Sequence, residues 1–108
     1  AERGRVTLVP VSDVVFLRAE LKYVTLRTRE REHLVEESLT QIEQEFGSVF
    51  VRIHRNCLVA RRWIRGFERG AETEGEDGWS VILEGLDEKL PVSRRQWPQV
   101  KSLGKAGE

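Results

Sequence analysis

The feature that most constrains this chain is the alternation of side chains between residues 23 and 29. Val24, Leu26 and Thr28 fall on one face of an extended segment, and Tyr23, Thr25, Arg27 and Arg29 fall on the other. A period of two with β-branched enrichment is the signature of a strand. The segment therefore predicts a strand, with a turn at 20–22 joining it to the apolar run before it.

Further short apolar runs, separated by turn residues, predict a mainly β fold of about seven strands. The additional expected strands lie at 5–9, 13–19, 49–53, 63–69, 79–84 and 88–92, and 33–35 is a candidate for one more short strand. The run at 57–60 is too apolar for a free loop, and we expect one helical turn there. An acidic turn is expected at 70–78.

Two small helices are expected, each opened by a serine. Ser38 and Gln41, and likewise Ser93 and Gln96, have the spacing of a capping box. Pro98 fits poorly deep inside a helix, so the second helix should have an irregular first turn or begin later. This layout is not the three-helix arrangement of a helix-turn-helix domain.

The length of 108 residues is enough for one domain with one core. We expect a linker remnant at 1–4, the domain at 5–103 and a frayed tail at 104–108. No apolar stretch suits a membrane span, and the single cysteine, Cys57, favours a reducing cytoplasm. The sequence has neither a Cys/His metal cluster nor a phosphate-binding glycine loop, so we expect no enzyme, no metal and no cofactor.

The charge is neutral overall but unevenly placed. Of 18 basic residues 14 are arginine, and the stretch 52–69 holds six arginines against one acid. The stretch 72–77 holds four acids and no base. We therefore expect a locally positive face despite the zero net charge. Guanidinium groups suit phosphates and guanine edges. The alternative is that arginine enrichment reflects a GC-rich genome alone.

Three motifs follow one another along the chain. Residues 15–17 with 22–24 read V-F-L and K-Y-V, residues 50–59 read F-V-R-I-H-R-N-C-L-V, and residues 90–95 read L-P-V-S-R-R. Together they resemble the LytTR DNA-binding domain family. The first resembles its opening hairpin, the last resembles its closing L-P-V-S-R, and Phe50, Arg52, His54, Arg55, Leu58 and Val59 match its central signature, which reads, approximately, F-x-R-x-H-R-S-x-L-V-N. The resemblance covers about residues 5–103. Asn56 replaces a usual serine and Ala60 a usual asparagine.

The resemblance implies an elongated set of short antiparallel sheets with small helices. It implies sequence-specific binding of double-stranded promoter DNA in transcription regulation, by turns and strand ends that enter successive major grooves. It also implies that the chain is the C-terminal output domain of a two-component response regulator. The expected partners are repeated half-sites, a receiver domain and a second copy on DNA.

The resemblance also implies which residues contact the bases, and the basic residues beside them suit the phosphates. The expected base-reading residues are Lys22, Arg55, Asn56 and Arg94, since arginine can pair with guanine and asparagine with adenine. The expected phosphate contacts are His54, Arg61, Arg62, Arg95 and Lys101.

Other interpretations of these residues stay open. A structural role for His54 is as good as a phosphate contact, and Arg52 can face solvent or pair with a carboxylate. Arginines at a helix N-terminus are electrostatically unfavourable, so Arg94 and Arg95 call for an external anion. The rival functions are a protein-interaction module with an Arg/Trp-rich surface and a binder of single strands, the latter disfavoured because few aromatic residues are available.

Overall fold

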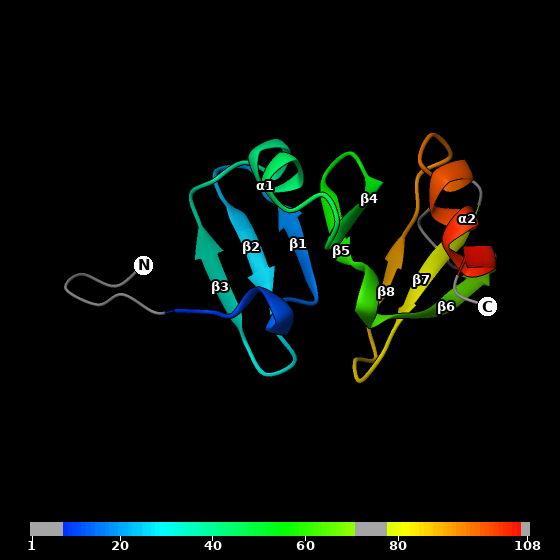
Figure 1. Ribbon diagram of the computed structural model, residues 1–108, viewed down its shortest axis with the longest axis horizontal. Coiled ribbons are helices and arrows are strands. Elements are labelled where there is room, and N and C mark those ends of the chain that lie inside the picture. The colour runs from blue at the N-terminus through cyan, green and yellow to red at the C-terminus, as the bar shows by residue number, and fades with distance from the viewer. Residues whose placement is uncertain (1–7, 71–77, 107–108) are drawn as a thin grey trace.

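A computed structural model describes residues 8–70 and 78–106 of the chain. This part holds eight strands, two α-helices and two short 3-10 turns, so the mainly β fold class is confirmed. The molecule is elongated, with extents of 44 × 29 × 26 Å. Figure 1 shows a larger sheet on one side and a smaller sheet with the C-terminal helix on the other.

The larger sheet has five antiparallel strands in the order β3-β2-β1-β5-β4. Phe16 of β1 pairs with Arg27 of β2 on one side and Val59 of β5 on the other, which makes β1 the central strand. The alternating segment forms β2, and its register with β3 aligns Val24 with Val35. The bounds are β1 Phe16–Ala19, β2 Val24–Arg27, β3 Glu32–Val35, β4 Phe50–His54 and β5 Cys57–Ala60.

The smaller sheet has three antiparallel strands in the order β6-β7-β8. Gly85, with a φ of 80°, lies in the turn between β7 and β8, where a positive φ favours glycine. From the same loop Glu88 contacts the larger sheet through Arg27, 3.3 Å from Nη1 to Oε1. The bounds are β6 Ile64–Arg69, β7 Trp79–Leu83 and β8 Lys89–Pro91.

Both expected helices are present. The helix α1, Leu39–Glu45, has the full capping box: Ser38 Oγ accepts from the Gln41 amide at 3.1 Å, and Gln41 Oε1 accepts from the Ser38 amide at 2.9 Å. The helix α2 spans Trp97–Ala106, so Pro98 lies in its first turn, where a missing amide proton costs no helical hydrogen bond. The late start confirms the expectation drawn from Pro98.

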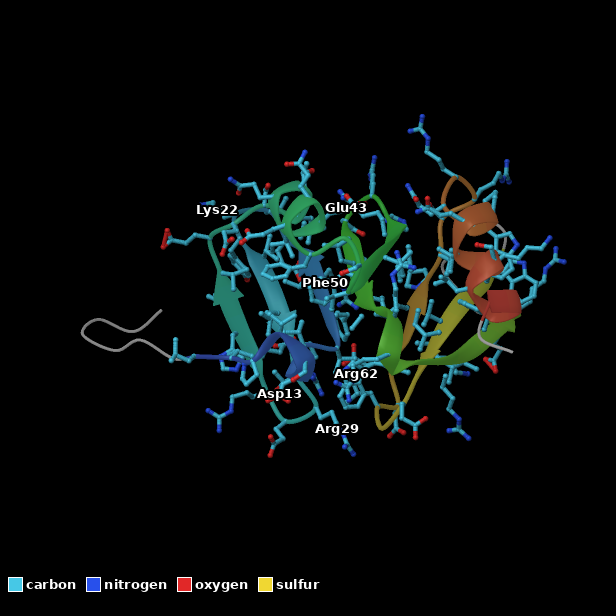
Figure 2. All side chains as sticks on the ribbon, viewed as in Figure 1. Asp13, Lys22, Arg29, Glu43, Phe50 and Arg62 are labelled. Carbon is cyan, nitrogen blue, oxygen red and sulfur yellow. The ribbon has the colours of Figure 1, made fainter. Side chains whose placement is uncertain are left out.

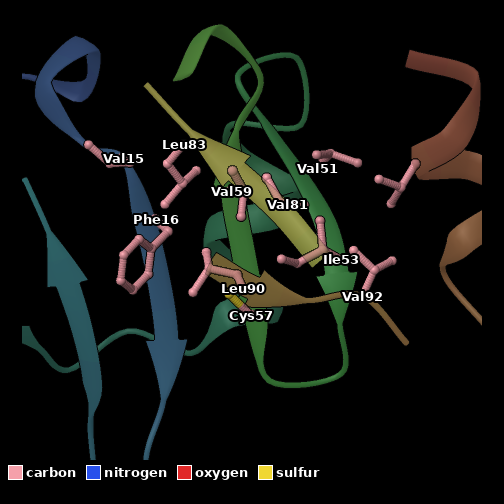
Figure 3. Close-up of a cluster of buried hydrophobic side chains, with 11 residues drawn as sticks. Val15, Phe16, Val51, Ile53, Cys57, Val59, Val81, Leu83, Leu90 and Val92 are labelled. Atoms are coloured by element: carbon pink, nitrogen blue, oxygen red, sulfur yellow. The ribbon is translucent and has the colours of Figure 1, made fainter. Parts of the chain in front are cut away.

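Two apolar clusters hold these layers together. One lies between the sheets and α2, and Figure 3 shows side chains from both sheets meeting there. The other lies between the larger sheet and α1. The two faces of β5 supply both clusters, since Cys57 and Val59 point to the first and Leu58 and Ala60 to the second.

The helical turn expected at 57–60 is wrong, because these residues form β5. All four side chains are buried, and a strand covered on both faces is apolar at every position rather than at alternate ones. Such a run looks the same as a buried helical turn when only the sequence is known.

Two other expectations concern the ends of the chain and a loop. Residues 8–10 are not a strand, and the rest of the expected strand at 5–9 lies outside the described residues, as do positions 71–77 of the expected acidic turn. The helix α2 continues to Ala106, so the first residues of the segment expected to fray are helical.

Candidate nucleic-acid interface

The turn after β1 and the turn after β4 lie side by side. The Ala19 amide donates to the Asn56 carbonyl at 2.8 Å, and Arg18 is paired with Cys57 across the sheet. The β1–β2 turn carries Lys22, and the two-residue β4–β5 turn is formed by Arg55 and Asn56. All three side chains are exposed. The pairing of β1 with β5 thus brings three of the expected base-reading residues to one edge of the molecule.

The closing motif joins the same end through an irregularity in β4. The register of β4 with β5 shifts between Arg52 and His54, which indicates a β-bulge. The Ile53 carbonyl accepts from the Ser93 amide at 2.9 Å, which ties the segment after β8 to the end of β4. Arg94 and Arg95 follow directly, both exposed, in a turn that precedes α2.

We call these three turns, residues 20–23, 55–56 and 94–96, the recognition rim. They lie along one long edge of the molecule, and Lys22 is labelled at that edge in Figure 2. The expected base-reading residues Lys22, Arg55, Asn56 and Arg94 are all on the rim, and so is Arg95. Lys101 is exposed on α2, one helical turn after the first residue of that helix.

A hollow of about 350 Å³ separates the first two turns from the start of α1. Its basic lining residues are Lys22, Arg52 and Arg55, and its acidic ones are Glu20, Glu36 and Glu37. The hollow is therefore close to neutral, and the further basic residues at this edge are Arg94, Arg95 and Lys101.

Arg52 holds the β4–β5 turn through contacts of its guanidinium group, which we call the brace. Its Nη1 contacts Glu43 Oε1 on α1 at 2.5 Å, its Nε donates to the His54 carbonyl at 3.1 Å, and its Nη2 donates to the Arg55 carbonyl at 2.9 Å. Its own carbonyl accepts from Gln99 Nε2 at 3.1 Å. Of the two alternatives for Arg52, pairing with a carboxylate is confirmed. The sequence did not identify Glu43 or Gln99 as its partners, because nothing in their spacing marks the pairing.

His54 ends β4 immediately before the turn. The residue is partly buried, and its Nδ1 is a buried atom for which the described residues supply no hydrogen-bond partner. An orienting bond from this nitrogen to a neighbour is therefore not made within the described part of the chain, and the phosphate role of His54 stays a prediction.

Arg61 and Arg62 lie at the opposite end of β5 from the rim. The backbone amide of Arg61 donates to the carbonyl of Val49, the residue before β4. The side chain of Arg61 donates from Nη2 to the Gly47 carbonyl at 3.3 Å. The Arg62 guanidinium lies over the Trp63 ring, 5.6 Å from its centroid, and Arg29 does the same. Figure 2 shows Arg29 and Arg62 at the edge opposite Lys22. The structure thus separates these two expected phosphate contacts from the other expected contacts.

The tryptophans serve the core more than the surface. Trp79 and Trp97 stack with centroids 4.4 Å apart, and Phe67 meets Trp97 edge to face at 5.4 Å. All three tryptophans are half-buried and pack against the cluster between the sheets. Base stacking by these rings would require them to leave that core.

Cys57 is buried behind the rim. Burial raises the pKa of its thiol to about 12, against the lowering effect of Arg18 and Arg52. Such a thiol is almost entirely protonated near neutral pH, and the thiolate is the nucleophilic form. The described ranges 8–70 and 78–106 contain no cluster of three or more potential metal ligands, and no helix among them could cross a membrane.

Comparison with known proteins shows the family and the fold of the chain. The chain is 43% identical over 102 residues to the positive alginate biosynthesis regulatory protein of Pseudomonas aeruginosa, covering 94% of this chain and 40% of that protein. The chain is therefore similar to a regulator of alginate biosynthesis. The chain is also 25% identical over 103 residues to the heme-containing CO-sensing transcriptional regulator RcoM 1 of Paraburkholderia xenovorans, covering 94% of this chain and 37% of that protein.

A solved structure and a family match complete the comparison. The LytTr DNA-binding domain of a Bacillus cereus response regulator superposes with a TM-score of 0.74 at 23% identity, covering 88% of this chain and 84% of the other, which bears on the fold alone. The chain spans about two fifths of the length of the curated relatives it matches. The LytTr DNA-binding domain family matches residues 4–105, and the chain belongs to this family.

Proposed function

We propose that this domain binds double-stranded DNA sequence-specifically through the recognition rim and thereby regulates transcription. The observation that carries the proposal is the meeting, at one edge, of three turns that are distant in sequence, each presenting exposed polar or basic side chains. Arg55 and Arg94 are the base-reading arginines, Asn56 reads an adjacent base, and Lys22 reads from the first turn. Arg95, Lys101 and His54 hold the phosphates.

The dimensions of the molecule support this arrangement. The long axis measures 44 Å, while one turn of B-DNA rises about 34–36 Å. Turns spread along such an edge can reach into neighbouring major grooves of one duplex. Arginine and asparagine side chains at their tips supply the bidentate donors and acceptors that distinguish guanine and adenine.

We further infer that the domain is the output half of a bacterial response regulator. The supporting observation is that its relatives are longer proteins, of which it matches about two fifths, and that one of them is named a regulator of alginate biosynthesis. A receiver domain, a second copy on DNA and repeated half-sites would complete the assembly. Such a regulator works in the cytoplasm, in agreement with the unpaired Cys57.

The test is selection of bound duplexes from a random pool, followed by affinity measurements on the recovered sequence and on an unrelated duplex. The recovered duplexes should share a repeated half-site. Arg55→Ala and Arg94→Ala should each weaken binding to the selected duplex by about 1–3 kcal/mol and relax the preference at separate positions. Wild-type affinity of both variants for the selected duplex would contradict the proposed reading residues.

The rival function, a protein-interaction module, has its own observation. Arg29 and Arg62 flank Trp63 at the edge opposite the rim, and arginine with tryptophan is typical of interaction hot spots. A duplex bound at the rim leaves this surface exposed, so the two functions are compatible. Recovery of no preferred duplex would favour the interaction module instead.

A further inference from the structure

One guanidinium group holds the β4–β5 turn in place without being available to DNA. The three nitrogens of Arg52 contact Glu43 Oε1, the His54 carbonyl and the Arg55 carbonyl, at 2.5, 3.1 and 2.9 Å. The side chain is only 17% exposed. Each of its three nitrogens thus has a partner within the protein, and little of the side chain is open to a phosphate.

The two carbonyl groups that Arg52 binds belong to the residues that enter the turn. Fixing the peptide planes after His54 and Arg55 fixes the direction in which the side chains of Arg55 and Asn56 leave the backbone. The β-bulge between Arg52 and His54 lies in the same stretch, where the ladder with β5 is interrupted. A bulge next to a binding turn has fewer ladder bonds to hold it, so a side-chain brace matters more there.

The brace is itself anchored from a separate element. Glu43 lies on α1, whose first turn is fixed by the capping box at Ser38. The Arg52 carbonyl accepts from Gln99 on α2, the helix that follows Arg94 and Arg95. Arg52 therefore connects α1, the β4–β5 turn and the helix beside the closing motif at a single residue.

We propose that Arg52, anchored by Glu43, is a positioning residue that sets the sequence preference of the rim by holding the Arg55–Asn56 turn. This inference rests on the proposed function. Reading a base edge requires a donor placed within about 0.5 Å, whereas attraction to phosphate tolerates displacement. Loss of the brace should therefore weaken binding to the selected duplex and spare binding to an unrelated one.

The experiment compares the 108-residue chain with its Arg52→Gln, Glu43→Gln and Glu45→Gln variants on the selected and the unrelated duplex. Arg52→Gln should lose about tenfold in affinity for the selected duplex, the size of one charge-assisted hydrogen bond, and less than about twofold for the unrelated one. The salt dependence on the unrelated duplex should stay unchanged, since no phosphate contact is removed.

Glu43→Gln gives the sharper result, because two explanations predict opposite signs. Removal of an acid near DNA should strengthen binding to every duplex if only the net charge matters. Loss of the anchor should instead weaken binding to the selected duplex by about threefold and leave the unrelated duplex unweakened. Glu45→Gln, at an exposed position on the same helix, is the charge-matched control and should strengthen both slightly or not at all.

The outcomes separate cleanly. A purely structural role for Arg52 would lower the folded fraction and so weaken both duplexes by the same factor, which would overturn the inference. Identical behaviour of Glu43→Gln and Glu45→Gln would also overturn it, even if Arg52→Gln were too unstable to measure. If Arg55→Ala loses affinity for the selected duplex while Glu43→Gln does not, only the role of the brace is refuted. If Arg55→Ala keeps its affinity for the selected duplex, both the brace and the proposed function are refuted.

Discussion

Salt dependence can decide which edge of the domain faces the duplex. Two charge-matched double variants make the comparison: Arg95→Gln with Lys101→Gln removes two cations expected at phosphates near the rim, and Arg61→Gln with Arg62→Gln removes two at the far end of β5. Each released phosphate contact changes the slope of log K against log salt by about 0.9. The first variant should therefore flatten the slope by about 1.8.

The expected size for the second variant follows from the length of β5. Four residues separate the Arg55–Asn56 turn from Arg61, so that Asn56 and Arg61 are about 16 Å apart along the strand. That exceeds the Debye length of about 8 Å at physiological salt, so these charges are largely screened from DNA held at the rim. Arg61 is also bonded to the Gly47 carbonyl and Arg62 lies over Trp63. The slope should change by less than about 0.3.

The assay is a titration of an unrelated duplex at four or more salt concentrations, read by fluorescence anisotropy. Circular dichroism checks that each variant is folded. If the Arg61/Arg62 variant flattened the slope as much as the Arg95/Lys101 variant, DNA would be contacting both edges. The assignment of the rim as the binding edge would then be refuted, and the phosphate roles expected of Arg61 and Arg62 would be supported.

Three further predictions concern the core and the hollow. Leu58→Ala should cost about 2–5 kcal/mol in chemical denaturation, because Leu58 is fully buried in the cluster under α1, while Leu34→Ala, 55% exposed, should cost less than about 0.5 kcal/mol. Cys57 should resist alkylation in the folded domain. The pKa of its thiol is about 12 in the folded domain, above the value of 9.0 in the unfolded chain. The thiol should therefore leave the free energy of unfolding unchanged below pH 9 and lower it between pH 9 and 12. Denaturation curves of Cys57→Ala should lack this decline. The double variant Glu36→Gln with Glu37→Gln should tighten binding to every duplex by a similar factor, because these carboxylates line the hollow beside Lys22. Mobility-shift assays would measure the change, and a gain in affinity for only one duplex would contradict this prediction.

Local chemistry explains the parts of the fold that were predictable. Ser38 and Gln41 form the capping box that their spacing indicates, because the bonds join residues only three apart. Pro98 delays α2 to Trp97 because a proline cannot donate a helical hydrogen bond. The alternation around Val24 marks β2 because Val24 and Leu26 lie on the face that packs in the cluster under α1, although Thr25 on the other face is buried as well.

The features that the sequence did not predict depend on contacts between residues distant in sequence. Residues 57–60 could be assigned to β5 only once layers on both sides were known, because an apolar run carries no period. Pairing of Arg52 with a carboxylate was one of two open alternatives. The partner, Glu43, is nine residues away and comes within reach only when α1 packs on the sheet.

From the sequence alone came the mainly β class, both helices and the three motifs that carry the reading residues, because each depends on patterns within a few residues. Only the tertiary structure decided which of those residues share an edge. Hydrogen bonds from Ala19 to Asn56 and from Ser93 to Ile53 bring three turns together, while the direction of β5 carries Arg61 and Arg62 to the other end. Strand register and chain direction arise from long-range pairing, which no local pattern encodes.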